Sequence, residues 1–230
     1  MSHRLDPKEL NLGWEQAYQE RDSDTLWQDE PIPFLAAADA ELKRRGAGEV
    51  VDLGCGDGRN LAALAAAGYR ATGVDVSETA LAKAERRLSS RELTARYVKA
   101  DAMSLPLEAA SADAMTCFDV FSHIARPEDA LTEVARVLRP GGLFVVNVFT
   151  TQDSECGSGE LLFGHTYHYR GTMFRFYEEA EVRELFRDWK ILELREERWL
   201  DPPHGEFRPY EHTHSNFLVF AVPPTPALES

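Results

Sequence analysis

Along residues 31–149, segments with the hydrophobic spacing of a helix alternate with short apolar runs typical of strands. The segment "PIPFLAAADAELKRRG" has helical spacing and ends in Gly46, which predicts a helix capped by that glycine. The apolar run "GEVVDLG" then predicts the first strand. Beyond it, helices are expected over 59–68, 78–90 and 127–139, and strands over 70–76, 95–101, 112–120 and 143–149. Such alternation predicts a parallel sheet with helices on both faces.

The pattern changes after Thr150. A polar loop rich in Gly and Ser occupies 151–160, and aromatic residues crowd 163–177 without a clear period, which we interpret as a lid or substrate wall. A helix over 177–189 and strands over 190–199 and 215–222 complete the pattern. No helix separates the last two strands, which favours an antiparallel hairpin at the sheet edge. The prediction is an α/β fold whose doubly wound, mostly parallel sheet has seven strands.

Composition and charge limit the kinds of partner that the protein is expected to bind. A chain of 230 residues suits one domain, and its net charge of −14 offers no general attraction to nucleic acid or to an anionic membrane. Neither is therefore expected as a partner. The three cysteines form no CxxC pair, which favours a reducing compartment. The sequence shows neither an apolar signal core nor a run long enough to span a bilayer, so a soluble, cytoplasmic protein is expected.

A glycine-rich turn follows the first predicted strand, in "VVDLGCGDGRN" at 50–60. Gly54, Gly56 and Gly58 let the backbone bend sharply and approach a ligand closely at the start of a helix. Their spacing is G-x-G-x-G rather than the dinucleotide fingerprint G-x-G-x-x-G, and Asp57 lies where a pyrophosphate would approach. Spacing and charge both predict a nucleotide-like ligand without a pyrophosphate.

Acidic residues recur at the carboxyl ends of the first three predicted strands. Asp75 ends the second strand, where an acid can accept the hydroxyls of a ribose, and Asp101 ends the third. Together with Asp52 they describe a site for a ribose, an amino group and an adenine amine.

These motifs resemble those of class I S-adenosylmethionine-dependent methyltransferases. "VVDLGCGDGRN", "GVDVSETAL" and "KADAMSLPL" resemble the family's first three motifs, and "ADAMTCFDVFSHI" with "ARVLRPGGLFVVNVF" resembles its fourth strand, following helix and fifth strand. The resemblance covers about residues 48–150, with weaker agreement to the end. It implies a Rossmann-like domain over 1–230, with an N-terminal lid segment (1–47), a cofactor-binding core (48–150) and a substrate-side part (151–230).

The resemblance implies S-adenosylmethionine as cofactor and S-adenosylhomocysteine as product. Asp52 would hold the ammonium group, Asp75 the ribose hydroxyls and Asp101 the adenine amine. The implied cofactor-binding residues are Asp52, Gly54, Cys55, Gly56, Asp75, Val76, Asp101, Ala102, Cys117 and Phe118, with Cys117 and Phe118 at the methionine and sulfonium end. The N-terminal segment resembles one that folds over the cofactor in some small-molecule methyltransferases, with Trp14, Tyr18 and Trp27 as candidate contacts; core anchoring is the alternative.

Methyl transfer from a sulfonium is an in-line displacement that needs a base only when the acceptor must lose a proton. His123 and Asp119, just past the fourth strand, are the candidate catalytic residues, and a packing or gating role for His123 stays open. The candidate substrate-binding residues are His165, Tyr167, His168 and Tyr169.

His212 and His214 alternate, so on a strand they share a face. An HxH pair can ligate a metal, but no third ligand is evident, and no metal site is expected. The function predicted is methyl transfer to a small-molecule acceptor. Two other functions are weighed beside it: a non-catalytic S-adenosylmethionine-binding regulatory module, and a nicotinamide-dependent oxidoreductase, which the charge of Asp57 disfavours.

Overall fold

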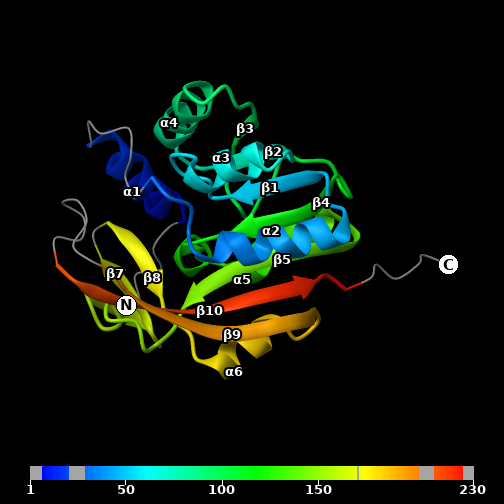
Figure 1. The fold of residues 1–230 in the computed structure, drawn as a ribbon. Helices are drawn as coiled ribbons and strands as arrows, with labels where there is room; N and C mark the ends of the chain where they lie inside the picture. The colour runs from blue at the N-terminus through cyan, green and yellow to red at the C-terminus, as the bar shows by residue number, and fades with distance from the viewer. Residues whose placement is uncertain (1–6, 21–28, 170, 202–209, 225–230) are drawn as a thin grey trace.

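A seven-stranded sheet forms the centre of the molecule, with strands in the order β3-β2-β1-β4-β5-β10-β9 (Figure 1). The computed structural model of the chain describes residues 7–20, 29–169, 171–201 and 210–224. The strands of the large sheet are β1 (Glu49–Leu53), β2 (Arg70–Asp75), β3 (Arg96–Lys99), β4 (Ala112–Cys117), β5 (Leu138–Phe149), β9 (Lys190–Asp201) and β10 (His212–Val222). The helices are α1 (Pro7–Gln19), α2 (Phe34–Arg45), α3 (Arg59–Ala66), α4 (Glu78–Ser89), α5 (Pro127–Val137) and α6 (Glu179–Leu185), with a short 3-10 helix η1 (Phe121–His123).

The pairing of the strands confirms the predicted architecture. β1 lies between β2 and β4, and all pairs from β3 to β5 are parallel. β10 pairs antiparallel with both β5 and β9, which gives the expected edge hairpin. Because β10 hydrogen-bonds to β5, residues 151–230 and residues 48–150 contribute to one sheet.

Helices cover both faces of the sheet, as the alternation predicts. Apolar side chains of α2, α3 and α4 pack on one face around Leu61 and Leu143, and those of α5 and α6 pack on the other around Met115 and Phe144. Val50 belongs to the first cluster and its neighbour Val51 to the second, because successive residues of a strand point to opposite faces. The parallel strands are therefore buried on both sides, which explains their continuous apolar runs.

Local signals account for the helix ends in the core. Gly46 ends α2 with φ 67°, a left-handed conformation that glycine adopts without strain. Ser77 begins α4 by accepting a hydrogen bond from the backbone N–H of Ala80 at 2.9 Å. The Gly46 cap agrees with the sequence interpretation, and Ser77 is a residue type that favours the start of a helix.

The aromatic segment that we interpret as a lid forms a second, three-stranded antiparallel sheet, β6 (Glu160–Phe163), β7 (Thr166–Tyr169) and β8 (Thr172–Arg175). It lies beside α1 at the left of Figure 1. The approach is close at Gly13, where an added Cβ would lie 2.2 Å from the carbonyl oxygen of Gly171. A glycine in α1 thus lets the helix contact the β7–β8 turn.

Two strands begin earlier than the hydrophobic runs predict. β5 starts at Leu138 rather than Leu143, with a bulge opposite β4 that accommodates Pro140 and the glycine pair. β10 starts at His212, so both histidines of the HxH pair lie on the strand. Among the helices of the described residues, none combines the length and apolar character needed to cross a bilayer.

Candidate functional site

A pocket opens at the carboxyl ends of β1, β2, β3 and β4, where the strand order reverses on either side of β1. In open α/β sheets this is the position at which ligands bind. Its walls come from the loops after these strands and from α1. The lining residues are Trp14, Tyr18, Leu53, Gly54, Cys55, Gly56, Asp57, Arg59, Asn60, Val74, Asp75, Val76, Ala100, Ala102, Phe118, Asp119, Val120 and His123.

The glycine turn shapes the floor of this pocket. Gly54 and Gly56 have φ of 74° and 53°, which other L-residues rarely adopt. An added Cβ on Gly54 would lie 2.2 Å from the side chain of Val120, and one on Gly56 would lie 2.5 Å from the Tyr18 hydroxyl. Both positions therefore require glycine for close approach as well as for the turn.

Asp75 is held at the pocket wall by the backbone of two loops. Its Oδ2 accepts a hydrogen bond from the N–H of Gly56 and its Oδ1 accepts one from the N–H of Ser77, both at 2.9 Å. Each oxygen keeps a further lone pair for a hydroxyl of a ligand. Burial is the main cause that raises the pKa of Asp75, to about 6, against the lowering effect of these hydrogen bonds.

Asp52 lies in β1 behind the pocket lining and is 1% exposed. Its Oδ1 accepts a hydrogen bond from the Thr116 hydroxyl at 2.8 Å, while none of the described residues donates one to Oδ2. Burial raises the pKa of Asp52 to about 7, although Thr116 and the charge of Arg59 act in the opposite direction. A buried carboxylate oxygen with unused acceptor capacity is suited to a cationic donor.

Asp57 lines the pocket and forms an ion pair with Arg87, whose Nη2 lies 3.3 Å from Asp57 Oδ2. Gly58 is the N-cap of α3. Burial raises the pKa of the Cys55 thiol well above its ordinary value, which removes the thiolate that a nucleophile needs. Cys55 is thus a small buried residue in the turn.

Of the predicted cofactor residues that follow β2 and β3, some line the pocket and one does not. Val76 and Ala102 line the pocket. Asp101 stands at the end of β3 but is not part of the lining; its Oδ1 accepts a hydrogen bond from the N–H of Met103 at 2.9 Å and stabilises the turn. Its predicted contact with an adenine amine stays a prediction.

Phe118 and Cys117 differ in position. Phe118 lines the pocket, whereas Cys117 is fully buried in the apolar cluster on the α5 side of the sheet. Cys117 ends β4 and Phe118 follows it, and consecutive side chains of an extended segment point to opposite faces. Phe118 alone of the two is therefore in the lining, and the contacts of both residues with the cofactor stay predictions.

His123 lines the pocket and joins three elements. Its Nδ1 lies 2.6 Å from the carbonyl oxygen of Met173, and its ring makes edge contacts with Trp14, Phe149 and Phe174 at centroid distances of 4.9, 5.5 and 4.6 Å. A carbonyl can only accept, so Nδ1 carries the proton, and in the neutral ring Nε2 is the basic nitrogen. The ring is fixed in orientation between α1, β5 and β8.

Asp119 also lines the pocket, in the left-handed conformation with φ 57°. Its Oδ1 accepts a hydrogen bond from Asn147 Nδ2 at 2.9 Å, its own N–H donates to Asn147 Oδ1 at 2.7 Å, and its Oδ2 pairs with Arg59 at 3.2 Å. These contacts hold an unfavourable backbone conformation at the pocket rim. Sequence reasoning missed Arg59 and Asn147, although a polar Asn147 inside the buried run "LFVVNVF" was a signal.

The N-terminal helix closes one side of the pocket. Tyr18 is 5% exposed, with its hydroxyl over Gly56, and Trp14 contacts His123. The Thr79 hydroxyl donates a hydrogen bond to Glu15 at 2.6 Å, which ties α1 to the start of α4. Trp27, the third predicted aromatic contact, lies outside the described residues.

The four predicted substrate residues do not line this pocket. Tyr167 and Tyr169 share a face of β7 and pack against Phe176 and Phe174, with centroids 6.0 and 5.9 Å apart. His168 lies between them on β7, and His165 lines a separate hollow beside α5 and α6. Their contact with an acceptor stays a prediction.

Residues 51–146 match a family described as a methyltransferase domain. This match, together with the relatives and solved structures below, supports a class I S-adenosylmethionine-dependent methyltransferase domain in this part of the chain. Curated relatives of the chain include a demethylmenaquinone methyltransferase of Clavibacter sepedonicus, 40% identical over 46% of the chain and 43% of the relative. A ubiquinone biosynthesis O-methyltransferase of Aromatoleum aromaticum is 32% identical over 62% of each. The chain thus spans about half of the length of these relatives.

Solved structures resemble the chain over nearly its whole length. The 1,6-didemethyltoxoflavin-N1-methyltransferase of Burkholderia thailandensis, solved with 1,6-didemethyltoxoflavin and S-adenosylhomocysteine, has a TM-score of 0.65 at 22% identity and covers 96% of this chain and 91% of its own. A second structure comes from work on the conversion of a disulfide bond into a thioacetal group during echinomycin biosynthesis. It has a TM-score of 0.72 at 20% identity and covers 95% of this chain and 94% of its own. At these identities the similarity shows a shared fold.

The pocket fits S-adenosylmethionine. The open acceptor position on buried Asp52 suits the ammonium group, and the remaining lone pairs of Asp75 suit the ribose hydroxyls. A Cβ on Gly54 or Gly56 would meet Val120 or the Tyr18 hydroxyl, so glycine at these positions lets both residues pack against the turn. The hydrogen-bond acceptors of the two aspartates therefore fit the ammonium group and the ribose of this cofactor.

Proposed function

We propose that this protein transfers a methyl group from S-adenosylmethionine to a small-molecule acceptor. The observation that carries the proposal is one pocket lined by the buried carboxyl group of Asp75 and by an oriented imidazole, with the buried carboxyl group of Asp52 behind its wall. The names of the curated relatives, which refer to menaquinone and ubiquinone precursors, support a small acceptor. The net charge of −14 supports an acceptor other than nucleic acid.

The chain's own residues position the reactants. When bound, S-adenosylmethionine supplies an electrophilic methyl group on a sulfonium. Asp75 and Asp52 would hold the ribose and ammonium ends, while the aromatic rings of Phe118 and Trp14 line the pocket, where rings stabilise positive charge. Tyr18 on α1 shields the glycine turn from water. Holding the acceptor in line with the methyl group is the main contribution that such a site makes to the rate.

We infer that His123 takes a proton from the acceptor. Nδ1 donates to the Met173 carbonyl and three rings fix the imidazole, so Nε2 is the basic nitrogen that would accept this proton. Asp119 is a positioning residue, since both of its carboxylate oxygens are engaged by Asn147 and Arg59.

The variant His123→Asn tests this role. Asparagine keeps an N–H near the position of Nδ1, so the contact with Met173 is retained while Nε2 is lost. For an acceptor that must lose a proton, we expect kcat to fall roughly 10²–10⁴-fold with S-adenosylmethionine affinity unchanged, and the acidic limb of the pH–rate profile to disappear. An unchanged kcat would assign His123 to packing.

Transfer of labelled methyl groups from S-adenosylmethionine to a panel of phenols, amines, thiols and carboxylic acids tests the activity itself. We expect turnover with at least one class and production of S-adenosylhomocysteine. Tight cofactor binding without turnover on the whole panel would contradict this proposal and favour the non-catalytic regulatory module.

A further inference from the structure

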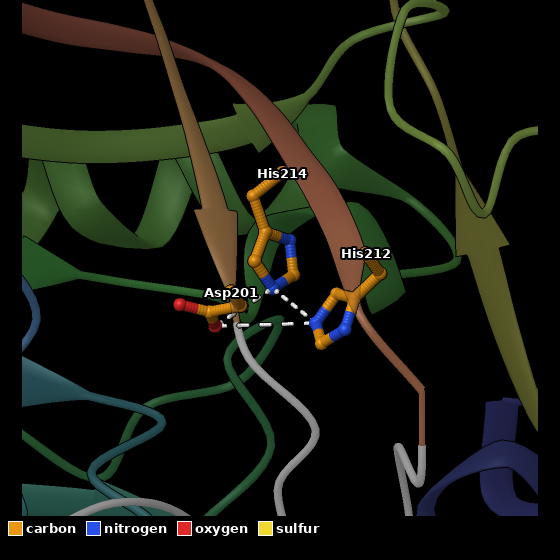
Figure 2. A group of neighbouring side chains, drawn as sticks. All are labelled: Asp201, His212 and His214. Carbon is orange, nitrogen blue, oxygen red and sulfur yellow. Dashed lines mark hydrogen bonds and ion pairs between the residues drawn. The ribbon is translucent and has the colours of Figure 1, made fainter.

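Two histidines and an aspartate converge where β9 ends and β10 begins. In the antiparallel register His212 lies opposite Asp201, and His214 lies opposite Trp199, so the two imidazoles and the carboxylate meet on one side of the hairpin. Figure 2 shows the rings and the carboxylate pointing toward one another. The cluster lies outside the lining of the cofactor pocket.

The potential ligand atoms are close together. His212 Nε2 lies 3.1 Å from His214 Nε2, and Asp201 Oδ2 lies 3.9 Å from the first and 3.5 Å from the second. Zinc binds nitrogen and carboxylate oxygen at about 2.0–2.2 Å, so two ligands in a tetrahedral site are about 3.3–3.5 Å apart. The three distances in the structure bracket that separation.

The contacts of the two Nδ1 atoms determine which ring nitrogens of His212 and His214 face the cluster. His212 Nδ1 lies 3.0 Å from the Tyr210 carbonyl oxygen, and His214 Nδ1 lies 3.3 Å from Asp153 Oδ2. A carbonyl and an ionised carboxylate only accept hydrogen bonds, so both Nδ1 atoms carry protons and the neutral rings turn their Nε2 lone pairs toward each other. Two lone pairs and a carboxylate at these distances repel one another, and a shared cation removes that repulsion.

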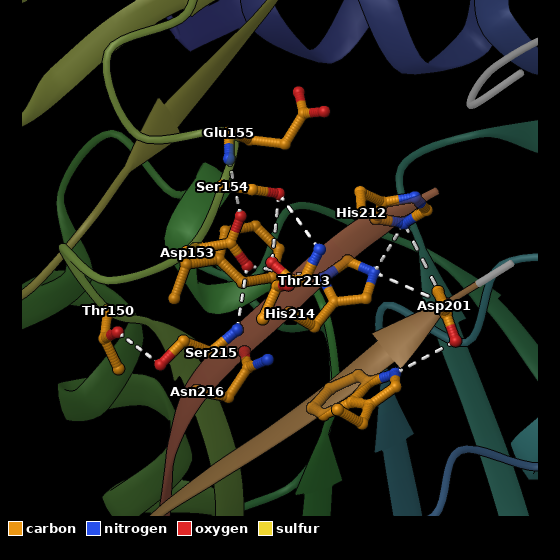
Figure 3. A network of polar contacts seen from close by, with 12 residues as sticks. Thr150, Asp153, Ser154, Glu155, Asp201, His212, Thr213, His214, Ser215 and Asn216 are labelled. Carbon is orange, nitrogen blue, oxygen red and sulfur yellow. Dashed lines mark hydrogen bonds and ion pairs between the residues drawn. The ribbon is translucent and has the colours of Figure 1, made fainter. Parts of the chain in front are cut away.

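Further hydrogen bonds orient the three side chains. The Trp199 indole N–H donates to Asp201 Oδ1 at 3.1 Å, which leaves Oδ2 directed at the histidines. Asp153, which orients His214, accepts hydrogen bonds from the backbone N–H of Ser215 at 3.1 Å and of Glu155 at 2.9 Å (Figure 3). A carboxylate behind a ligating histidine is the usual outer partner of a metal site.

We propose that Asp201, His212 and His214 bind one divalent transition-metal ion of the zinc type. Borderline metals such as zinc and cobalt favour imidazole with carboxylate. The side chains of His212, His214 and Asp201 are 1%, 12% and 19% exposed, so an ion bound by them is shielded from solvent. Three protein ligands leave one position of a tetrahedral site for water or another ligand.

The position of the ion suggests what it does for the fold. It joins the end of β9 to the start of β10 and, through Asp153, to the loop after β5. Asn216, two residues after His214, accepts a hydrogen bond from Asn147, which in turn holds Asp119 at the pocket rim. The metal would therefore fix the substrate-side hairpin against the carboxyl edge of the sheet.

Binding of Zn²⁺ and Co²⁺ to tag-free protein stripped with EDTA tests the proposal. We expect one equivalent of either metal by calorimetry, a visible Co²⁺ absorption typical of four-coordinate nitrogen and oxygen ligands, and a rise in Tm with Zn²⁺. His214→Ala and Asp201→Asn should abolish the stoichiometric site. Asp153→Asn should weaken it by about 10–100-fold, because it removes the outer carboxylate and not a ligand.

The matched control is His168→Ala, which removes a half-buried histidine on β7 and should leave metal affinity unchanged. Far-ultraviolet circular dichroism establishes that each variant is folded. Wild-type protein that binds no metal would overturn the proposal and leave a proton shared by the two imidazoles as the cation. Equal affinity in folded His214→Ala and wild type would overturn it as well.

Discussion

Asp75→Ala is expected to weaken binding of S-adenosylmethionine by about 2–4 kcal/mol, or roughly 30–1000-fold in Kd. Asp75 lines the pocket, and its two oxygens are oriented by the N–H groups of Gly56 and Ser77. Alanine removes the acceptors for both ribose hydroxyls and also releases the glycine turn that Asp75 holds. Calorimetric titration with S-adenosylmethionine measures the loss.

The control for Asp75→Ala is Asp188→Ala, which removes an acidic side chain that is 77% exposed near the end of α6. It matches the change in charge and should bind the cofactor as the wild type does. Asp75→Asn should lie between the two, since the amide keeps one acceptor oxygen. Unchanged affinity in folded Asp75→Ala would contradict the assignment of this pocket to the cofactor.

Cofactor affinity is expected to rise steeply with pH between about 5.5 and 7.5. Burial raises the pKa of Asp52 to about 7 and that of Asp75 to about 6, so in the free protein both groups are largely protonated below these values. An ammonium group and ribose hydroxyls need the ionised carboxylates as acceptors. Below about pH 6 each pH unit should therefore cost up to tenfold in affinity per titrating group, and binding should release protons.

Calorimetry in two buffers with different ionisation enthalpies counts the protons released, and Asp52→Asn should remove the part of the pH dependence centred near pH 7. Affinity that is independent of pH would show that neither carboxyl group takes part.

The same shift affects the stability of the free protein. In the unfolded chain Asp52 loses its proton near its ordinary pKa of 3.8, whereas in the folded protein it keeps the proton to about 7. Between these values the folded state binds more protons, so the contribution of Asp52 to stability falls as pH rises through this window and then levels off. Cofactor binding thus offsets the loss of folding stability that ionisation of buried Asp52 causes in the free protein near neutral pH.

The parts of the fold that depend on local signals could be predicted from the sequence. The glycine turn, the Ser77 cap and the alternation of strands and helices each follow from residues close together in the chain, and the strand order agrees with them. The small sheet β6-β7-β8 was not predicted as strands. All three of its strands have only four residues, and β7 and β8 pack against α1, η1 or the aromatic cluster, so neither of these two shows a clear alternation of polar and apolar positions.

The parts of the site that depend on distant partners could not be predicted. Asn147 reaches Asp119 across 28 positions and Arg59 reaches it across 60, and no spacing rule connects them. Asp201 meets the histidine pair because the register of the edge hairpin places it opposite His212, and that register cannot be obtained from the sequence of either strand alone. Cys117 and Phe118 were assigned the same role because adjacency in sequence conceals opposite faces.

The central claim is that the pocket at the glycine turn holds S-adenosylmethionine, and calorimetric binding of S-adenosylmethionine and S-adenosylhomocysteine, with NAD as control, tests it most directly. The account predicts micromolar or tighter binding of the first two at one site per chain, and none of NAD, whose pyrophosphate would approach Asp57. Absence of binding for both S-adenosyl compounds, or equal binding of NAD, would contradict it.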